Sequence, residues 1–142
     1  MTVLLDTNVL SELIARRPDP HVIAWMDQQD PETVFLSVIA EGELRRGIQK
    51  LPDSPRKKKL ADWLHGRLLI RFGDRILALD LPVMLTWGAL VARLEAAGRI
   101  LPAIDSLLAA TVARHGLSIA TCNVRDFKPV GISVVNPWEA GV

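Results

Sequence analysis

Short apolar runs alternate with longer segments of helical periodicity along the whole chain. The apolar runs are almost unbroken, which is typical of strands in a parallel sheet that is covered on both faces. The predicted strands are residues 3–5, 34–36, 76–78, 118–120 and 133–135. The predicted helices are residues 8–13, 20–28, 38–50, 55–72, 81–97 and 103–114.

Residues at the ends of these segments support the boundaries. Ser37 is suited to cap the helix that follows the second strand. Pro82 and Pro102 fit the first turns of their helices, and Gly98 and Gly116 stand where two helices should end. The pattern therefore predicts separate helices rather than one long helical segment.

Strands that alternate with helices predict an α/β fold, a three-layer α/β/α sandwich with a mostly parallel central sheet of about five strands. The length of 142 residues predicts a single domain over residues 1–142. Residues 136–138, Asn-Pro-Trp, are expected to leave the last strand as a surface tail.

Composition narrows the setting of the protein. Lys and Arg number 17 against 16 Asp and Glu, and Cys122 is the only cysteine, so no internal disulfide can form. No apolar stretch approaches the roughly 18 residues of a membrane span, and the N-terminus lacks the basic start of a signal peptide. We therefore expect a cytoplasmic protein that does not enter a membrane.

Four acidic residues interrupt or end apolar segments. Asp6 follows the first strand, Glu43 lies in the helix after the second, Asp105 starts the helix before the fourth, and Asp126 follows the fourth. Ligands bind outside the carboxyl ends of parallel strands, and all four residues map to that edge. Carboxylates near a core are costly unless compensated, so a cation such as Mg²⁺ or Mn²⁺, bound through oxygen, is the hypothesis.

Each acid also has a simpler explanation. Asp6 is suited to cap its helix, and Asp105 to stabilise the first turn of its own. Glu43 is positioned to pair with Arg46 or to face solvent. Glu41, on the same helix, is expected to be exposed. The shared edge of the sheet favours the metal hypothesis over these alternatives.

Polar neighbours of the acids are candidate supporting groups. Thr7 and Asn8 follow Asp6 at a strand-to-helix turn, and Thr121 and Asn123 lie in the loop after the fourth strand. Either Asn123 or Asp126 can complete the cation shell, and the sequence leaves this choice open.

Other chemistries find little support. The three histidines, His21, His65 and His115, lie in separate segments, which argues against a histidine-based acid–base site or a zinc site. Neither a glycine-rich phosphate loop nor a Gly-x-Ser-x-Gly motif is present. Cys122 is interpreted as a strand-end residue and Arg125 as facing solvent.

Basic residues are concentrated between positions 45 and 75. They are Arg45, Arg46, Lys50, Arg56, Lys57, Lys58, Lys59, Arg67, Arg71 and Arg75, against the acids Asp53, Asp62 and Asp74. A basic section beside an acidic metal site suits a polyanion such as RNA. The candidate RNA contacts are Arg45, Arg46, Lys57, Lys58 and Lys59. The alternative is a solvated helix face whose long side chains cover apolar surface.

Five segments in order resemble the motifs of PIN-domain proteins. They are VLLDTNVLSE at 3–12, GELRRGI at 42–48, AIDSLLAAT at 103–111, TCNVRDF at 121–127 and VNPW at 135–138. The resemblance covers the whole chain and is strongest to VapC-type toxins of the FitB-like subgroup.

The resemblance implies an Mg²⁺- or Mn²⁺-dependent endoribonuclease, the toxin of a type II toxin–antitoxin pair. It implies that Asp6, Glu43 and Asp105 bind the metal, with Asn123 or Asp126 at the fourth position. It also implies a homodimer and a VapB-like antitoxin that enters the active-site groove, forms a larger heteromer and supplies the binding to operator DNA.

Two other functions fit parts of the pattern. One is a non-catalytic PIN-like module that binds RNA or protein. It is suggested by Asn123, which stands in the fourth motif where some relatives have an acid. A receiver-like phosphoacceptor domain also gathers acids at a sheet edge, but only Asp80 and Lys128 approach its requirements for an acceptor and a late lysine. The metal-dependent nuclease remains the hypothesis that accounts for most of these residues.

Overall fold

A five-stranded parallel sheet forms the centre of the computed structural model, which describes residues 1–139. The strands are β1 (Val3–Leu5), β2 (Val34–Ser37), β3 (Ile76–Leu77), β4 (Ser118–Ala120) and β5 (Ser133–Val135). Their order is β3-β2-β1-β4-β5, and every neighbouring pair is parallel. The predicted α/β fold with a parallel sheet of five strands is confirmed.

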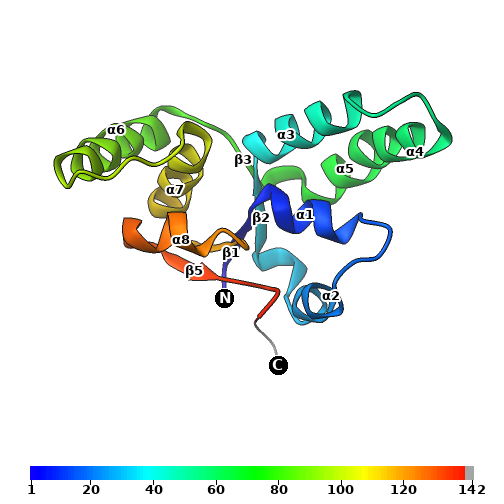
Figure 1. Ribbon diagram of the computed structural model, residues 1–142, viewed down its shortest axis with the longest axis horizontal. Coiled ribbons are helices and arrows are strands. Elements are labelled where there is room, and N and C mark those ends of the chain that lie inside the picture. The colour runs from blue at the N-terminus through cyan, green and yellow to red at the C-terminus, as the bar shows by residue number, and fades with distance from the viewer. Residues whose placement is uncertain (140–142) are drawn as a thin grey trace.

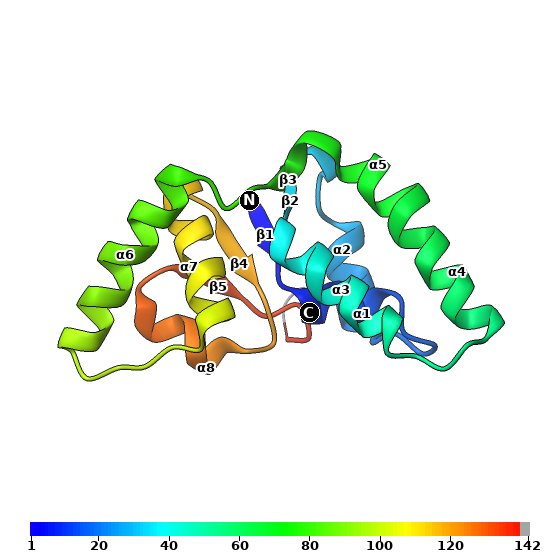
Figure 2. The same cartoon turned by 90° about the horizontal axis from the view of Figure 1, so that it is seen from above.

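Helices cover the sheet on both sides, with α1 to α5 on one side and α6 to α8 on the other (Figures 1 and 2). The helices are α1 (Thr7–Leu13), α2 (Pro20–Asp27), α3 (Val38–Gln49), α4 (Pro55–Trp63), α5 (Leu69–Phe72), α6 (Leu81–Ala96), α7 (Ala103–His115) and α8 (Val124–Phe127). Short turns of tighter or wider helix are η1 (Pro31–Thr33), η2 (Leu64–Leu68), η3 (Gly73–Arg75) and η4 (Lys128–Val130). Over residues 1–139, no helix has the length and apolar character needed to cross a membrane.

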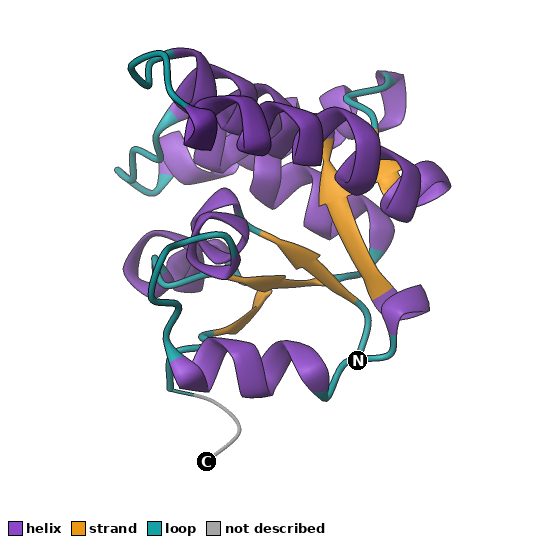
Figure 3. Cartoon of the chain, turned by 90° about the vertical axis from the view of Figure 1, so that its right-hand side faces the viewer, coloured by secondary structure: helices purple, strands orange, loops and turns teal. Residues whose placement is uncertain are grey.

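The sheet divides two hydrophobic cores. Successive side chains of a strand point to opposite faces, so Val3 and Leu5 of β1 enter one core while Leu4 enters the other. All three residues are completely buried. Coverage of both faces explains why the strands are apolar at every position, and Figure 3 shows the strands enclosed by helices.

Capping residues place the helix ends largely as predicted. Ser37 accepts a hydrogen bond from the Ile39 amide at 3.0 Å at the start of α3. Pro82 lies in the first turn of α6, whereas Pro102 stands one residue before α7. Gly116 ends α7 in the left-handed region with φ of 66°, where glycine lacks the steric penalty of other residues.

Three local predictions differ from the structure. The predicted helix over 55–72 is interrupted by the π-helical turn η2, which contains Gly66, a residue that weakens a regular helix. Residues 124–127 form a short helix rather than a loop. Trp138 packs against the core on the α1–α5 side, so residues 136–138 are not a surface tail.

Candidate active site

The four acidic residues lie at the carboxyl edge of the sheet, each on a different segment. Asp6 follows β1 directly, Glu43 lies in the second turn of α3, Asp105 in the first turn of α7, and Asp126 in α8. Parallel strands end at a common edge, so segments far apart in the sequence meet there. The structure places these side chains in one connected hydrogen-bond network.

Asp6 is the most buried member of this group, with 7% of its surface exposed. Its Oδ1 accepts a hydrogen bond from the Thr7 amide at 2.7 Å, and its Oδ2 accepts from the Thr121 hydroxyl at 2.8 Å and the Asn8 amide at 3.1 Å. Asp6 is also the N-cap of α1. Asp6 therefore caps α1 and at the same time belongs to the acidic network.

The environment of Asp6 opposes its ionisation. Burial raises the pKa of the Asp6 carboxyl, and the nearby charge of Glu43 raises it further. The hydrogen bonds from Thr121, Thr7 and Asn8 act in the opposite direction, since they favour the ionised form. The carboxylate is held by donors rather than by a neighbouring cation.

Thr7 connects Asp6 to Glu43. Its hydroxyl donates to Glu43 Oε1 at 2.6 Å across 36 positions of sequence. Glu43 forms no ion pair with Arg46. Among residues 1–139 the ion pairs are His21–Asp19 and Lys57–Asp53. Glu43 therefore faces the site.

Asn123 connects Asp105 to Asp126. Its side-chain nitrogen donates to Asp126 Oδ2 at 2.9 Å and to Asp105 Oδ2 at 3.3 Å, while its backbone amide donates to the Thr121 hydroxyl at 2.9 Å. In this arrangement Asn123 is a donor between two carboxylates rather than an oxygen ligand. Asp105 and Asp126 are therefore joined through one shared donor, Asn123.

The pKa of Asp105 depends on its burial and on the charges of the other three acids. Burial makes the largest contribution and raises the pKa of its carboxyl. The charges of Asp6 and Asp126, a hydrogen bond with Asp126 and the charge of Glu43 raise it further, to about 6. Each contribution disfavours the ionised carboxyl. An added cation would reverse this balance.

The four carboxylates suit a hard divalent cation chemically, but their oxygens are not grouped around one point. Over residues 1–139, no cluster of three or more His, Cys, Asp or Glu side chains is arranged to hold a metal ion. Thr7 and Asn123 bridge the carboxylates instead. Carboxylate oxygens are the ligands preferred by Mg²⁺ and Mn²⁺, so the residues fit the ion chemically.

The predicted basic contacts lie on two neighbouring helices, α3 and α4. Lys57 pairs with Asp53 at 3.4 Å, and Arg45 contacts the His65 ring. Lys58 and Lys59 instead line a cavity of about 710 Å³ between α4 and the segment after α1. Arg46 is exposed on α3, so these side chains are divided among different environments.

Glu41 differs from its expected exposed position. The residue is half-buried, and its Oε1 is fully buried with no hydrogen-bond partner in the part of the chain that the structure describes. Burial raises the pKa of its carboxyl. Leu44 and Ile48, at helical spacings of three and seven, are core residues, which was the available signal that Glu41 borders the apolar face.

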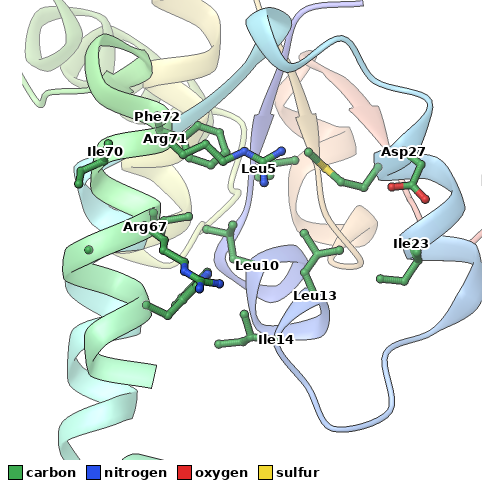
Figure 4. Close-up of a pocket in the computed structure, with 14 residues that line it drawn as sticks. Leu5, Leu10, Leu13, Ile14, Ile23, Asp27, Arg67, Ile70, Arg71 and Phe72 are labelled. Carbon is green, nitrogen blue, oxygen red and sulfur yellow. The ribbon is translucent and has the colours of Figure 1, made fainter. Parts of the chain in front are cut away.

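An apolar groove of about 650 Å³ separates α1 and α2 from η2 and α5 (Figure 4). It is lined by Leu5, Leu10, Leu13, Ile14, Ile23, Met26, Asp27, Trp63, Gly66, Arg67, Leu68, Ile70, Arg71 and Phe72. Figure 4 shows Arg67 and Arg71 on the α5 side and Asp27 on the α2 side. Sequence reasoning missed this groove because its residues come from separate segments.

The fold and the acidic edge agree with the family to which the sequence is related. The PIN domain family matches residues 3–132, and the chain belongs to this family. Its sequence is 39% identical to the plasmid stability protein StbB of Pseudomonas syringae, over 97% of this chain and 99% of that protein.

Two further relatives have names that bear on activity. The VapC ribonuclease Y4jK of Sinorhizobium fredii is 36% identical over 96% of this chain and 98% of its own length. The toxin FitB of Neisseria gonorrhoeae is 36% identical over 96% of this chain and 99% of its own length.

Solved structures agree with the fold in detail. The crystal structure of FitAcB from Neisseria gonorrhoeae superposes with a TM-score of 0.92 at 36% identity, covering 96% of this chain and 99% of that chain. A structure of FitAB bound to a DNA fragment gives a TM-score of 0.93 at 33% identity, covering 99% of this chain and 98% of the other.

Proposed function

We propose that this protein is a metal-dependent endoribonuclease and the toxin of a toxin–antitoxin pair. The observation that carries the proposal is the network of four carboxylates at the carboxyl edge of a PIN-domain sheet. Similarity to a VapC ribonuclease and to the toxin FitB supports RNA as the substrate and toxicity as the role.

Asp6, Glu43, Asp105 and Asp126 are the residues that would hold Mg²⁺ or Mn²⁺. When bound, such an ion activates water and neutralises charge that develops on a phosphodiester. The Asp6 carboxylate has a fixed orientation, because three donors hold it and most of the residue's surface is buried. These four acids are therefore both the proposed metal ligands and the proposed catalytic residues.

Thr7, Asn8, Thr121 and Asn123 are proposed positioning residues. Their hydroxyl and amide groups donate to the acids and set the orientation of each carboxylate. Asp105 has a raised pKa, so its proton must leave before the carboxylate can bind a cation. The mechanism therefore predicts that cation binding is weakened in acid.

A VapB-like antitoxin is the proposed protein partner. The resemblance implies an antitoxin in the active-site groove; the surface proposed here is the apolar groove between α1–α2 and α5, where Leu13, Ile14 and Ile23 can contact an amphipathic segment. Arg67 and Arg71 can contact its acidic side chains. FitAB has been solved bound to DNA, which supports a complex that reaches operator DNA through the antitoxin. A homodimer, a larger heteromer with antitoxin and a cytoplasmic site of action belong to the same proposal.

Cleavage of RNA by purified protein tests this function. Labelled RNA is incubated with Mn²⁺ or Mg²⁺ and with EDTA, in parallel with Asp6→Asn and with the surface control Asp53→Asn. We expect products only with metal, from the parent and the control but not from Asp6→Asn. Stoichiometric RNA binding without products at any Mn²⁺ concentration would instead favour a non-catalytic binding module.

A further inference from the structure

A second, smaller cavity borders the acidic network on the α6–α8 side. Its volume is about 280 Å³, and its lining comes from the end of α6 with the segment that follows it and from α8 and η4. Its lining includes Leu94, Arg99, Ile100, Arg125, Asp126 and Val130. Asp126 belongs both to this cavity and to the proposed catalytic acids, so the two are adjacent.

Backbone hydrogen bonds fix the walls of this cavity. At the end of α6, the Gly98 amide donates to the Glu95 carbonyl at 2.9 Å and the Arg99 amide to the Leu94 carbonyl at 2.8 Å. This is the Schellman arrangement, and the φ of 72° at Gly98 permits it. The position of the Arg99 backbone is therefore set by the end of α6.

The opposite wall is also attached to α6. The Arg93 guanidinium donates to the Val130 carbonyl at 3.0 Å and joins α6 to η4. Val130 is buried in the core on this side of the sheet. Both sides of the cavity are thus connected to α6.

The chemistry of the lining is mixed in an unusual way. Ile100 is 94% exposed, although side chains of this kind gain free energy when removed from water. Arg99 and Arg125 are exposed beside it, and among residues 1–139 neither belongs to an ion pair. An apolar surface flanked by two guanidinium groups matches a ligand with a flat apolar face and a negative charge.

We propose that this cavity binds one RNA nucleotide next to the phosphate that is cleaved. Arg99 and Arg125 contact phosphate oxygens, and Ile100 packs against the base or ribose. Small-molecule pockets span about 300–1,000 Å³, and a cavity of about 280 Å³, just below that range, leaves room for one nucleotide at most. The proposal rests on the ribonuclease function and assigns Arg125 a role beyond facing solvent.

An RNA ligand explains the location better than a protein segment does. The cavity shares Asp126 with the catalytic acids, so an RNA chain bound across the acids lies next to the cavity. The larger apolar groove on the α1–α5 side is the surface proposed for the antitoxin.

Salt-dependent binding tests the two arginines. A short labelled single-stranded RNA is titrated in EDTA, which prevents cleavage, with the parent, Arg99→Ala and Arg125→Ala. The control is Arg114→Ala, an exposed arginine in the last turn of α7. Each test variant should bind more weakly, with a slope of log K against log salt that is shallower by about 0.7. Slopes equal to that of Arg114→Ala would overturn the proposal.

Steady-state cleavage tests the apolar wall. Ile100→Ser should raise KM, whereas Ile100→Phe should retain or lower it, because an aromatic ring stacks on a base. Melting temperatures verify that the variants fold. An unchanged KM in both variants would overturn this part of the proposal.

The outcomes separate this inference from the function on which it rests. If the parent cleaves RNA and the Arg99 and Arg125 variants behave like Arg114→Ala, the ribonuclease function stands and the nucleotide site is wrong. If the parent does not cleave RNA with metal, the proposed function fails, and the binding slopes in EDTA still decide whether this cavity contacts RNA. Loss of antitoxin binding rather than RNA binding would assign the cavity to the protein partner and overturn the proposal.

Discussion

The acidic edge of the sheet and the groove between α1–α2 and α5 are built in opposite ways. At the acidic edge, four segments contribute carboxylates that hydroxyl and amide groups connect through bonds of 2.6 to 3.3 Å. In the groove, the lining is mostly apolar, with exposed side chains such as Ile70 and arginines on one side.

The difference fits the proposal that the acidic edge carries out the chemistry and that the groove binds the partner protein. Carboxylates connected by hydrogen bonds at one edge suit catalysis, because catalytic groups must be positioned before the reaction. An open apolar surface suits a partner segment that removes it from water. Changes at one region should therefore leave the property of the other intact.

The largest expected effect is on cleavage at the acidic edge. Asp105→Asn removes a charge that the proposed ion requires, so we expect the cleavage rate to fall by about 10²–10³-fold or more. Rates are compared at saturating Mn²⁺, with Asp53→Asn as the surface control. Binding of the antitoxin through the groove should persist, and a variant that still cleaves at the parental rate would remove Asp105 from the proposed metal site.

A charge in the groove should affect the partner without affecting cleavage. Ile70→Glu places a carboxylate in an apolar contact, and we expect antitoxin affinity to fall by about 10- to 100-fold. Ile70 is 76% exposed, so the fold should tolerate the change. Calorimetric titration with the antitoxin measures the effect, and Leu85→Glu, an exposed apolar position on α6 outside the groove, is the control. Equal affinities in the two variants would contradict the proposed docking surface.

Metal should stabilise the acidic edge but not a variant of it. At a metal concentration of 100 times Kd, binding stabilises the folded state by about 2.7 kcal/mol, which corresponds to a rise in Tm of about 5–10 °C. Thermal unfolding with and without Mn²⁺ measures the shift in the parent and in Asp126→Asn. The same shift in both proteins would exclude Asp126 as the fourth ligand.

The smallest expected effect is the dependence of stability on pH without metal. The pKa of Asp105 is raised from 3.8 to about 6, so the folded state binds more protons than the unfolded state between these values. This carboxyl therefore destabilises the fold above pH 6, and the penalty disappears as the pH falls towards 4.

Comparison with Asp105→Asn isolates this contribution, because asparagine is always neutral. In EDTA, the variant should have the higher Tm at pH 7.5, and the two values of Tm should converge near pH 4. A constant difference across this range would show that Asp105 does not titrate as its surroundings require.

The local pattern was sufficient for much of the fold. Each of the predicted strands forms, and the order of strands and helices correctly places the acids at the carboxyl edge, because parallel crossovers leave few other topologies. Interruptions were harder to predict: the π turn η2 lies within a segment whose helical periodicity is unbroken in the sequence. Trp138 follows a proline like many tail residues, yet it packs against the core.

The sequence by itself determined the sheet, the helices and the identity of the acids, since these depend on periodicity and on the order of segments. Only the tertiary structure decided that Thr7 bridges to Glu43, that Asn123 donates to Asp105 and Asp126, and that an apolar groove and a smaller cavity flank the site. Hydrogen bonds and cavities depend on differences of a few tenths of an ångström in the distances between segments that are far apart in the chain. Local residue patterns do not encode those distances, which arise when the two cores pack on either side of the sheet.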